Sequence, residues 1–133
     1  MPDKTPYVAA IGRRKTAVAR VRLMKAKEAS VTVNGMPAKD YFHTDERTLI
    51  SEESLKAAEL DGIYAVTAKV AGGGIAAQAD AVRMGIARAA TMVNPNTRGT
   101  LKSAGFLKRD PRAKERKKPG LVKARKRKQW SKR

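Results

Sequence analysis

The chain has 133 residues, a formal net charge of +18 at pH 7 and no cysteine. This length suits one small domain, and without cysteine there is no disulfide, no thiolate metal site and no cysteine nucleophile. A charge this high favours a polyanionic partner, with nucleic acid first among the candidates.

The positive charge is concentrated toward the C-terminus. Residues 1–97 contain 14 Lys or Arg and 10 Asp or Glu, whereas residues 98–133 contain 16 and 2. The net charge is therefore +4 in the first part and +14 in the second. We predict a globular domain over residues 1–105 and a basic tail over residues 106–133. The first residues lack the apolar run of a signal peptide or membrane span, so we expect a cytoplasmic protein.

The first predicted element is a β-hairpin over residues 7–25. An apolar run at residues 7–11 leads into a basic turn at residues 12–15, after which small or apolar residues alternate with Arg20 and Arg22. This period of two places both arginines on the open face of a half-buried sheet. An ordinary solvated sheet face would mix charges of both signs, so we favour phosphate contact here. The cations of this region are Arg13, Arg14, Lys15, Arg20, Arg22, Lys25 and Lys27.

The turn of this hairpin is not a nucleotide-binding P-loop, although it contains Gly12, Lys15 and Thr16. A P-loop needs a second glycine directly before the lysine and a helix after it. Here an arginine precedes Lys15, and a strand pattern follows.

The middle of the chain predicts a short strand and an acidic helical segment. The strand, residues 30–33, is closed by an Asn34-Gly35 turn, and Pro37 ends its pairing. Residues 44–60 predict one broken helix or two short ones, with Thr44 as the N-cap. Six of the ten acids of the first part fall in or next to this segment, so we expect it to face away from a polyanion.

A glycine run, Gly72-Gly73-Gly74, joins a predicted strand at residues 64–70 to the strongest helical pattern of the chain, at residues 75–93. Glycines before a helix let the backbone approach a phosphate, which the first N–H groups of the helix would then bind. A tight turn explains the same residues equally well, and no dinucleotide-binding fingerprint is present. Both readings stay open. A turn or short helix is expected at residues 97–103.

The tail has no pattern of a folded element. Its apolar residues follow neither helical nor strand spacing, Pro111 and Pro119 interrupt any helix, and its cations repel one another. We expect it to be extended and to bind a polyanion by releasing counterions, with salt-dependent affinity that ignores sequence. It lacks the apolar face of a membrane-binding helix.

One aromatic residue, Trp130, lies isolated among the basic residues of the tail. With no core to join, it is suited to stacking on a base or ribose.

No catalytic or metal-binding constellation is visible. His43 is the only histidine, and Glu52 and Glu53 are adjacent residues that point in different directions on a helix. We therefore expect no enzymatic activity, no cofactor and no small-molecule substrate.

Several separated motifs resemble the ninth protein of the small ribosomal subunit, the S-nine family in its bacterial form. The matching stretches are GRRKTAVARV at residues 12–21, GGG at 72–74 with Gln78, GIARA at 85–89, GFL at 105–107, ERKK at 115–118 and SKR at 131–133.

The resemblance implies an α+β fold like the second domain of ribosomal protein S-five, with a small mixed sheet, two main helical segments and an extended basic C-terminal tail. It implies binding to 16S ribosomal RNA in the 3′ major domain of the subunit head, beside head proteins such as S-seven, S-ten and S-fourteen. It also implies that Ser131, Lys132 and Arg133 reach the anticodon stem-loop of the peptidyl-site tRNA.

The residues expected to bind ribosomal RNA come from the hairpin, the glycine run and the tail. They are Arg13, Arg14, Lys15, Arg20, Arg22, Gly72, Gly73, Gly74, Lys108, Arg109, Arg112, Arg116, Lys117, Lys118, Lys123, Arg125, Lys126, Arg127, Lys128 and Trp130. The tail alone also allows an alternative, a free nucleic-acid packaging protein that would bind DNA and RNA interchangeably.

Overall fold

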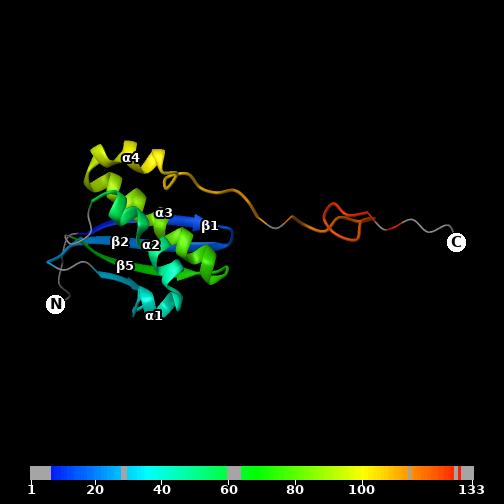
Figure 1. The fold of residues 1–133 in the computed structure, drawn as a ribbon, viewed down its shortest axis with the longest axis horizontal. Helices are drawn as coiled ribbons and strands as arrows, with labels where there is room; N and C mark the ends of the chain where they lie inside the picture. Colours follow the sequence, from blue (N-terminus) through cyan, green and yellow to red (C-terminus); the bar gives the residue numbers. More distant parts are fainter. Residues whose placement is uncertain (1–6, 28–29, 60–63, 114, 128, 130–133) are drawn as a thin grey trace.

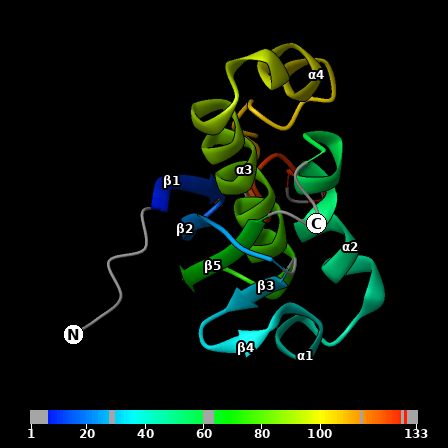
Figure 2. The same cartoon turned by 90° about the vertical axis from the view of Figure 1, so that its left-hand side faces the viewer.

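A five-stranded mixed sheet with helices on one side forms the domain (Figures 1 and 2). The computed structural model describes residues 7–27, 30–59, 64–113, 115–127 and 129. The strand order is β1-β2-β5-β3-β4; all pairings are antiparallel except that of β3 with β5. This arrangement confirms the predicted α+β class. The elements are β1 Tyr7–Arg14, β2 Ala17–Lys25, β3 Ser30–Val33, β4 Met36–Pro37, α1 Ala38–Phe42, α2 Asp45–Ala57, β5 Tyr64–Ala71, α3 Ile75–Val93, a 3-10 turn Pro95–Thr97 and α4 Arg98–Ser103.

The hairpin is confirmed, but its turn is shorter than predicted. β1 continues to Arg14, which pairs with Ala17, so only Lys15 and Thr16 remain for the turn. Lys15 has a positive φ of 53°, which a two-residue hairpin turn requires. Arg13 and Arg14 therefore belong to the strand, because pairing with β2 satisfies their backbone groups.

The acidic segment forms one continuous helix, α2, so the prediction of one broken helix or two short ones was wrong in both forms. Thr44 is the N-cap, and its Oγ1 accepts a hydrogen bond from the amide of Arg47 at 3.4 Å. The five-residue helix α1 was not predicted, because its sequence is too short to show a helical period.

Helix α3 has the predicted bounds and packs closely on β1 and β2. A Cβ atom at Gly12 would lie 1.8 Å from the Ala81 carbonyl oxygen, and one at Gly85 would lie 2.5 Å from Val21 Cγ2. The two glycines therefore let backbone meet backbone at this contact. Arg88 Nη1 also donates a 2.7 Å hydrogen bond to the carbonyl of Ile11, which covers part of the β1 edge.

Both long helices lie on the same side of the sheet, with α2 packed against α3 (Figure 2). The core between these layers is apolar and contains Val21, Leu23, Phe42, Val66, Val82, Ile86 and Leu101. Among the described residues no helix covers the other side of the sheet, so one face is left open.

The tail leaves the domain after its first residues, as expected of an extended segment (Figure 1). Phe106 and Leu107 still pack against the core, and Arg83 lies over the Phe106 ring at 5.1 Å. Residues 115–127 then form a small loop, closed by an isolated bridge between Leu121 and Arg127. The tail is therefore not extended throughout. In the described part of the chain, no helix has the length and apolar character needed to cross a membrane.

Candidate nucleic-acid interface

The open face of the sheet carries cations from three strands. The register places Ile11 opposite Arg20 and Arg20 opposite Lys69, so their side chains share this face. Arg22 lies one pleat further along, opposite Thr67. Both predicted arginines, Arg20 and Arg22, are exposed. None of the residues of β1, β2 and β5 is acidic, so the face presents positive charge only.

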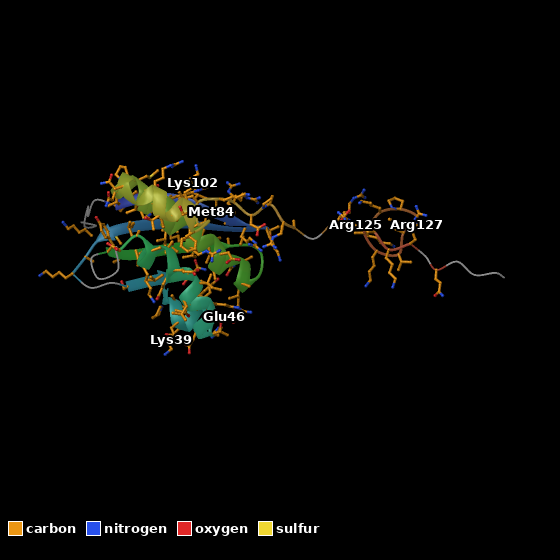
Figure 3. The ribbon with its side chains drawn as sticks, turned by 45° about the horizontal axis from the view of Figure 1, so that its top comes forward. Lys39, Glu46, Met84, Lys102, Arg125 and Arg127 are labelled. Atoms are coloured by element: carbon orange, nitrogen blue, oxygen red, sulfur yellow. The ribbon has the colours of Figure 1, made fainter. Side chains whose placement is uncertain are left out.

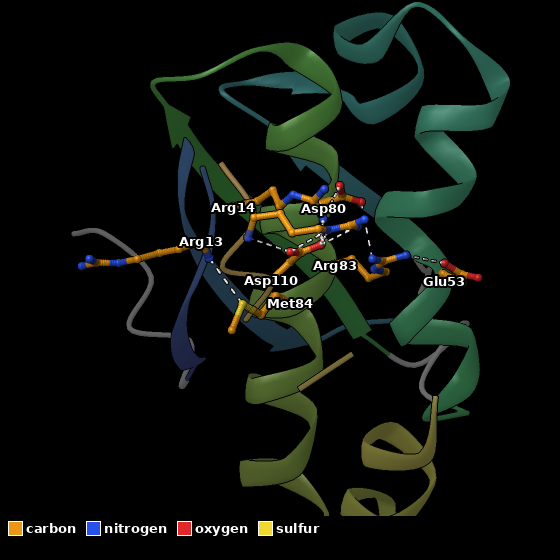
Figure 4. Close-up of polar contacts among 8 residues, drawn as sticks. Arg13, Arg14, Glu53, Asp80, Arg83, Met84 and Asp110 are labelled. Carbon is orange, nitrogen blue, oxygen red and sulfur yellow. Dashed lines mark hydrogen bonds and ion pairs between the residues drawn. The ribbon is translucent and has the colours of Figure 1, made fainter. Parts of the chain in front are cut away.

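The two adjacent arginines at the end of β1 point to opposite sides of the sheet. Arg13 is exposed and points away from the helices, whereas Arg14 points toward α3 (Figure 4). The strand period of two requires this separation. Because the turn was predicted at residues 12–15, no pattern in the sequence distinguished the two arginines.

Arg14 is held in a cluster of ion pairs at the point where the tail begins. Its Nη1 lies 2.7 Å from Asp110 Oδ2 in the tail and 3.5 Å from Asp80 Oδ2 in α3. Arg83 extends the cluster, with contacts of 3.4 Å to Asp80 and 3.0 Å to Glu53 (Figure 4). Arg14 therefore connects β1, α3 and the tail, and its role as an RNA contact stays a prediction.

Asp110 is the centre of this connection. Arg112 donates three side-chain contacts to its carboxylate, at 2.7 to 3.0 Å, and its backbone amide donates another at 2.9 Å. These hydrogen bonds, assisted by the charge of Arg14, hold the pKa of Asp110 far below its ordinary value. The same contact raises the pKa of Arg112. The first residues of the tail thus have a defined path on the domain.

The glycine run lies beside the hairpin turn. Gly72 and Gly73 have φ values of 78° and 65°, and a Cβ atom at Gly72 would lie 2.5 Å from the carbonyl oxygen of Thr16. Positive φ and close packing explain why glycine is needed at both positions. Gly74 is the N-cap of α3 and is exposed. The run is therefore a tight turn, and phosphate binding by its backbone stays a prediction.

Two consecutive hydrogen bonds, made by side chains of α3 and α1, support this turn. Gln78 Nε2 donates to the Gly72 carbonyl at 3.0 Å, and Tyr41 donates its hydroxyl proton to Gln78 Oε1 at 2.6 Å. On the other side, Arg109 Nη2 donates to the carbonyl of Lys15 at 3.4 Å. The structure thus brings the hairpin turn, the glycine run and the start of the tail to one end of the sheet.

Most of the tail cations lie away from the domain. Figure 3 shows Arg125 and Arg127 on the loop of residues 115–127, separated from the sheet. Glu115 closes this loop through ion pairs with Lys118 and with Arg125, the latter at 2.7 Å, and both contacts lower the pKa of Glu115. The other described tail cations are exposed and include Lys108, Arg109, Arg112, Arg116, Lys117, Lys123 and Lys126.

Five predicted site residues lie outside the described residues. They are Lys128, Trp130, Ser131, Lys132 and Arg133. The predicted stacking of Trp130 and the predicted tRNA contacts of the last three residues are therefore not addressed by the geometry.

The acids of α2 lie on the helical side of the domain. Asp45, Glu46 and Glu53 are exposed there, and Figure 3 shows Glu46 on the helical side. The charge of the domain thus differs between its two sides: the strands of the open face carry cations and no acid, whereas α2 carries four acids against two cations. This division is what a protein that binds a polyanion through its sheet requires.

Sequence reasoning missed several residues of this arrangement, among them Lys69 and Asp110. Lys69 was recognised as part of a strand, but only the register shows that it lies opposite Arg20. Asp110 was counted as one of two acids in a basic tail, and only the tertiary structure shows it bound to Arg14. Within the described ranges, no group of three or more potential metal ligands comes together.

A comparison with protein families gives one match over nearly the whole chain. The family model described as ribosomal protein S9/S16 matches residues 12–133. The match begins at the close contact of β1 with α3 and extends through the tail.

Proposed function

Since the chain belongs to the ribosomal protein S9/S16 family, and so has a structural role in the small ribosomal subunit, we propose that it sits in the subunit head and binds 16S ribosomal RNA through two surfaces. The first is the open sheet face with Arg13, Arg20 and Arg22. The second is the basic tail. Its protein neighbours in the head would be S-seven, S-ten and S-fourteen.

The observation that carries this proposal is the separation of charge across the domain. The strands that form the open face contain no acid, while α2 exposes several acids on the helical side. RNA would therefore be attracted to one side and repelled from the other. The α2 side, where Leu49 is 55% exposed beside Glu46 and Glu53, is better suited to a neighbouring protein.

The end of the tail is proposed to contact the anticodon stem-loop of the peptidyl-site tRNA. The contacts between Asp110 and Arg14 support this role, because they anchor the start of the tail on the domain. A fully extended chain from residue 110 to residue 133 spans at most about 83 Å. Since the loop at residues 115–127 shortens this reach, it would open when the tail binds.

Sedimentation tests the ribosomal assignment. A lysate is separated on sucrose gradients at about 0.1 M and about 1 M salt, and the protein is followed against the small subunit. A free binder with roughly eight phosphate contacts would lose about a million-fold in affinity over this range. We expect the protein to stay with the subunit at unit stoichiometry in both gradients. Loss at high salt, or sedimentation with DNA, would favour the packaging protein.

The tRNA contact is tested by Lys132→Gln together with Arg133→Gln in reconstituted subunits. We expect weaker tRNA binding at the peptidyl site with normal subunit formation, because two charge-assisted contacts are lost. The matched control, Lys39→Gln with Lys56→Gln, removes two exposed cations from the helical side. Unchanged tRNA affinity in the tail variant, or an equal loss in the control, would contradict the proposal.

A further inference from the structure

The open sheet face is more than a positive surface, because it also contains an apolar cleft. The cleft has a volume of about 340 Å³ and is lined by residues of β1, β2 and β5. Its apolar lining includes Tyr7, Ala9 and Ile11, which share one face of β1. Tyr7 is 51% and Ile11 is 43% exposed. Binding to phosphate groups does not by itself explain why a basic face exposes these apolar side chains.

The aromatic end of the cleft presents a flat, cationic surface. The guanidinium carbon of Arg22 lies 4.8 Å from the centroid of the Tyr7 ring. Tyrosine rings and arginine planes are the groups on which unpaired RNA bases stack. Thr67, opposite Arg22 in the neighbouring strand, adds a hydroxyl group that can donate to or accept from a base edge or a ribose.

The other end of the cleft brings two like charges together. Arg20 and Lys69 are direct cross-strand neighbours, and like charges in this position destabilise a sheet. Neither side chain forms an ion pair with any other described residue. An anion between them would remove the repulsion, and a phosphate is the anion that an RNA supplies.

We propose that this cleft binds an unpaired nucleotide of RNA. The base lies over the apolar residues beside the Tyr7 and Arg22 pair, and its phosphate lies between Arg20 and Lys69. A base in a duplex is stacked and paired, so a duplex can offer its phosphates to this face but cannot place a base in the cleft. The inference rests on the proposed binding of ribosomal RNA and specifies a bulge, loop or single strand as the element bound by the sheet.

Methyl NMR of the full-length protein tests the inference at the cleft itself. Ile11 is the reporter, while Ile50 in α2 and Ile75 at the start of α3 lie on other parts of the surface. The probes are an unstructured oligouridylate and an RNA duplex of the same length. We expect the Ile11 methyl signal to shift with the single strand and to change little with the duplex, and Ile50 to shift with neither.

Two variants without charge change complete the test. Tyr7→Ala should lower affinity for the single strand by about tenfold, because it removes a stacking surface, and should leave duplex affinity and the salt dependence unchanged. Leu49→Ala, which alters an equally exposed apolar residue on the acidic helix, is the matched control and should change neither affinity.

The possible results separate the inference from the proposed function. Equal Ile11 shifts with both probes would overturn the inference, because the face would then bind phosphates only. Binding of both probes without any Ile11 shift would also overturn it, because the tail alone would bind RNA. In both cases RNA binding by the protein would remain. Absence of binding to either probe would contradict the proposed function as well.

Discussion

The close contact between β1 and α3 makes Gly12→Ala a demanding test of the packing. The added Cβ atom would lie 1.8 Å from the carbonyl oxygen of Ala81 and 2.5 Å from the amide nitrogen of Gly85. Both atoms belong to the backbone of α3, so rotation of a side chain cannot relieve the overlap. The strand and the helix must move apart.

The size of the effect follows from the distance. Ordinary van der Waals contact begins at 3.4 Å, so the gap at Ala81 must widen by roughly 1.6 Å. Overpacking of a well-packed core costs about 1–3 kcal/mol, and displacing α3 also loosens Val82 and Ile86 in the core. We therefore expect a loss of about 3 kcal/mol or more in the free energy of unfolding. For a domain of about 100 residues this lowers the melting temperature by at least about 12 °C.

Thermal and urea unfolding of the full-length variants, followed by circular dichroism, measure this loss. Gly99→Ala in α4 is the matched control, because no atom lies within 4 Å of a Cβ at that position. There alanine should be neutral or stabilise the helix by up to about 1 kcal/mol. If Gly12→Ala unfolds at the same temperature as the parent, or if Gly99→Ala loses as much, the packing argument is wrong.

Further predictions concern the second glycine and the tail. Gly85→Ala should lower the free energy of unfolding by about 1 kcal/mol, because the overlap of the new Cβ with Val21 outweighs the higher helix propensity of alanine. In urea unfolding, the effects of Gly85→Ala and Val21→Ala should not add in the double variant, because the two residues are in contact. Asp110→Asn should let trypsin cut the start of the tail several-fold faster, and an unchanged rate would argue against an anchored tail. The arginine partners of Asp110 lower the pKa of its carboxyl group. The carboxylate should therefore stabilise the tail contact fully above the ordinary pKa of 3.8, and this stabilisation should be lost only as the pH falls through the lowered pKa. An NMR titration midpoint near 3.8 would contradict this prediction. Glu115→Gln should open the loop at residues 115–127, with a larger radius of gyration in X-ray scattering.

The elements with strong periods were predictable from sequence. Helix α3 was predicted with its exact bounds, residues 75–93, because its apolar spacing continues over five turns. The exposure of Arg20 and Arg22 followed from alternation in β2 in the same way. The end of β1 was not predictable, because Arg13 and Arg14 are both charged and so do not continue the alternation of apolar and polar residues that marks a strand. Their pairing with β2 depends on the partner strand.

The candidate interface was predictable only in part. Its arginines could be named from the sequence, but the cleft could not, because it depends on which strands are neighbours. β5 pairs with β2 across about 40 intervening residues, and only this pairing places Thr67 and Lys69 beside the arginines. Asp110 gave no signal of its own, since an acid in a basic tail is equally compatible with simple solvation.

The amino-acid sequence by itself predicted a polyanionic partner, a domain followed by a basic tail, and two main helical segments, because charge and periodicity are properties of neighbouring residues. The tertiary structure alone decided that Lys69 joins Arg20 and Arg22 on the open face, that Arg14 contacts the start of the tail, and where the apolar cleft lies. These depend on strand register and on the contact of β1 with α3, both of which join residues far apart in the chain. Contacts between distant residues depend on packing, which a local sequence pattern does not predict.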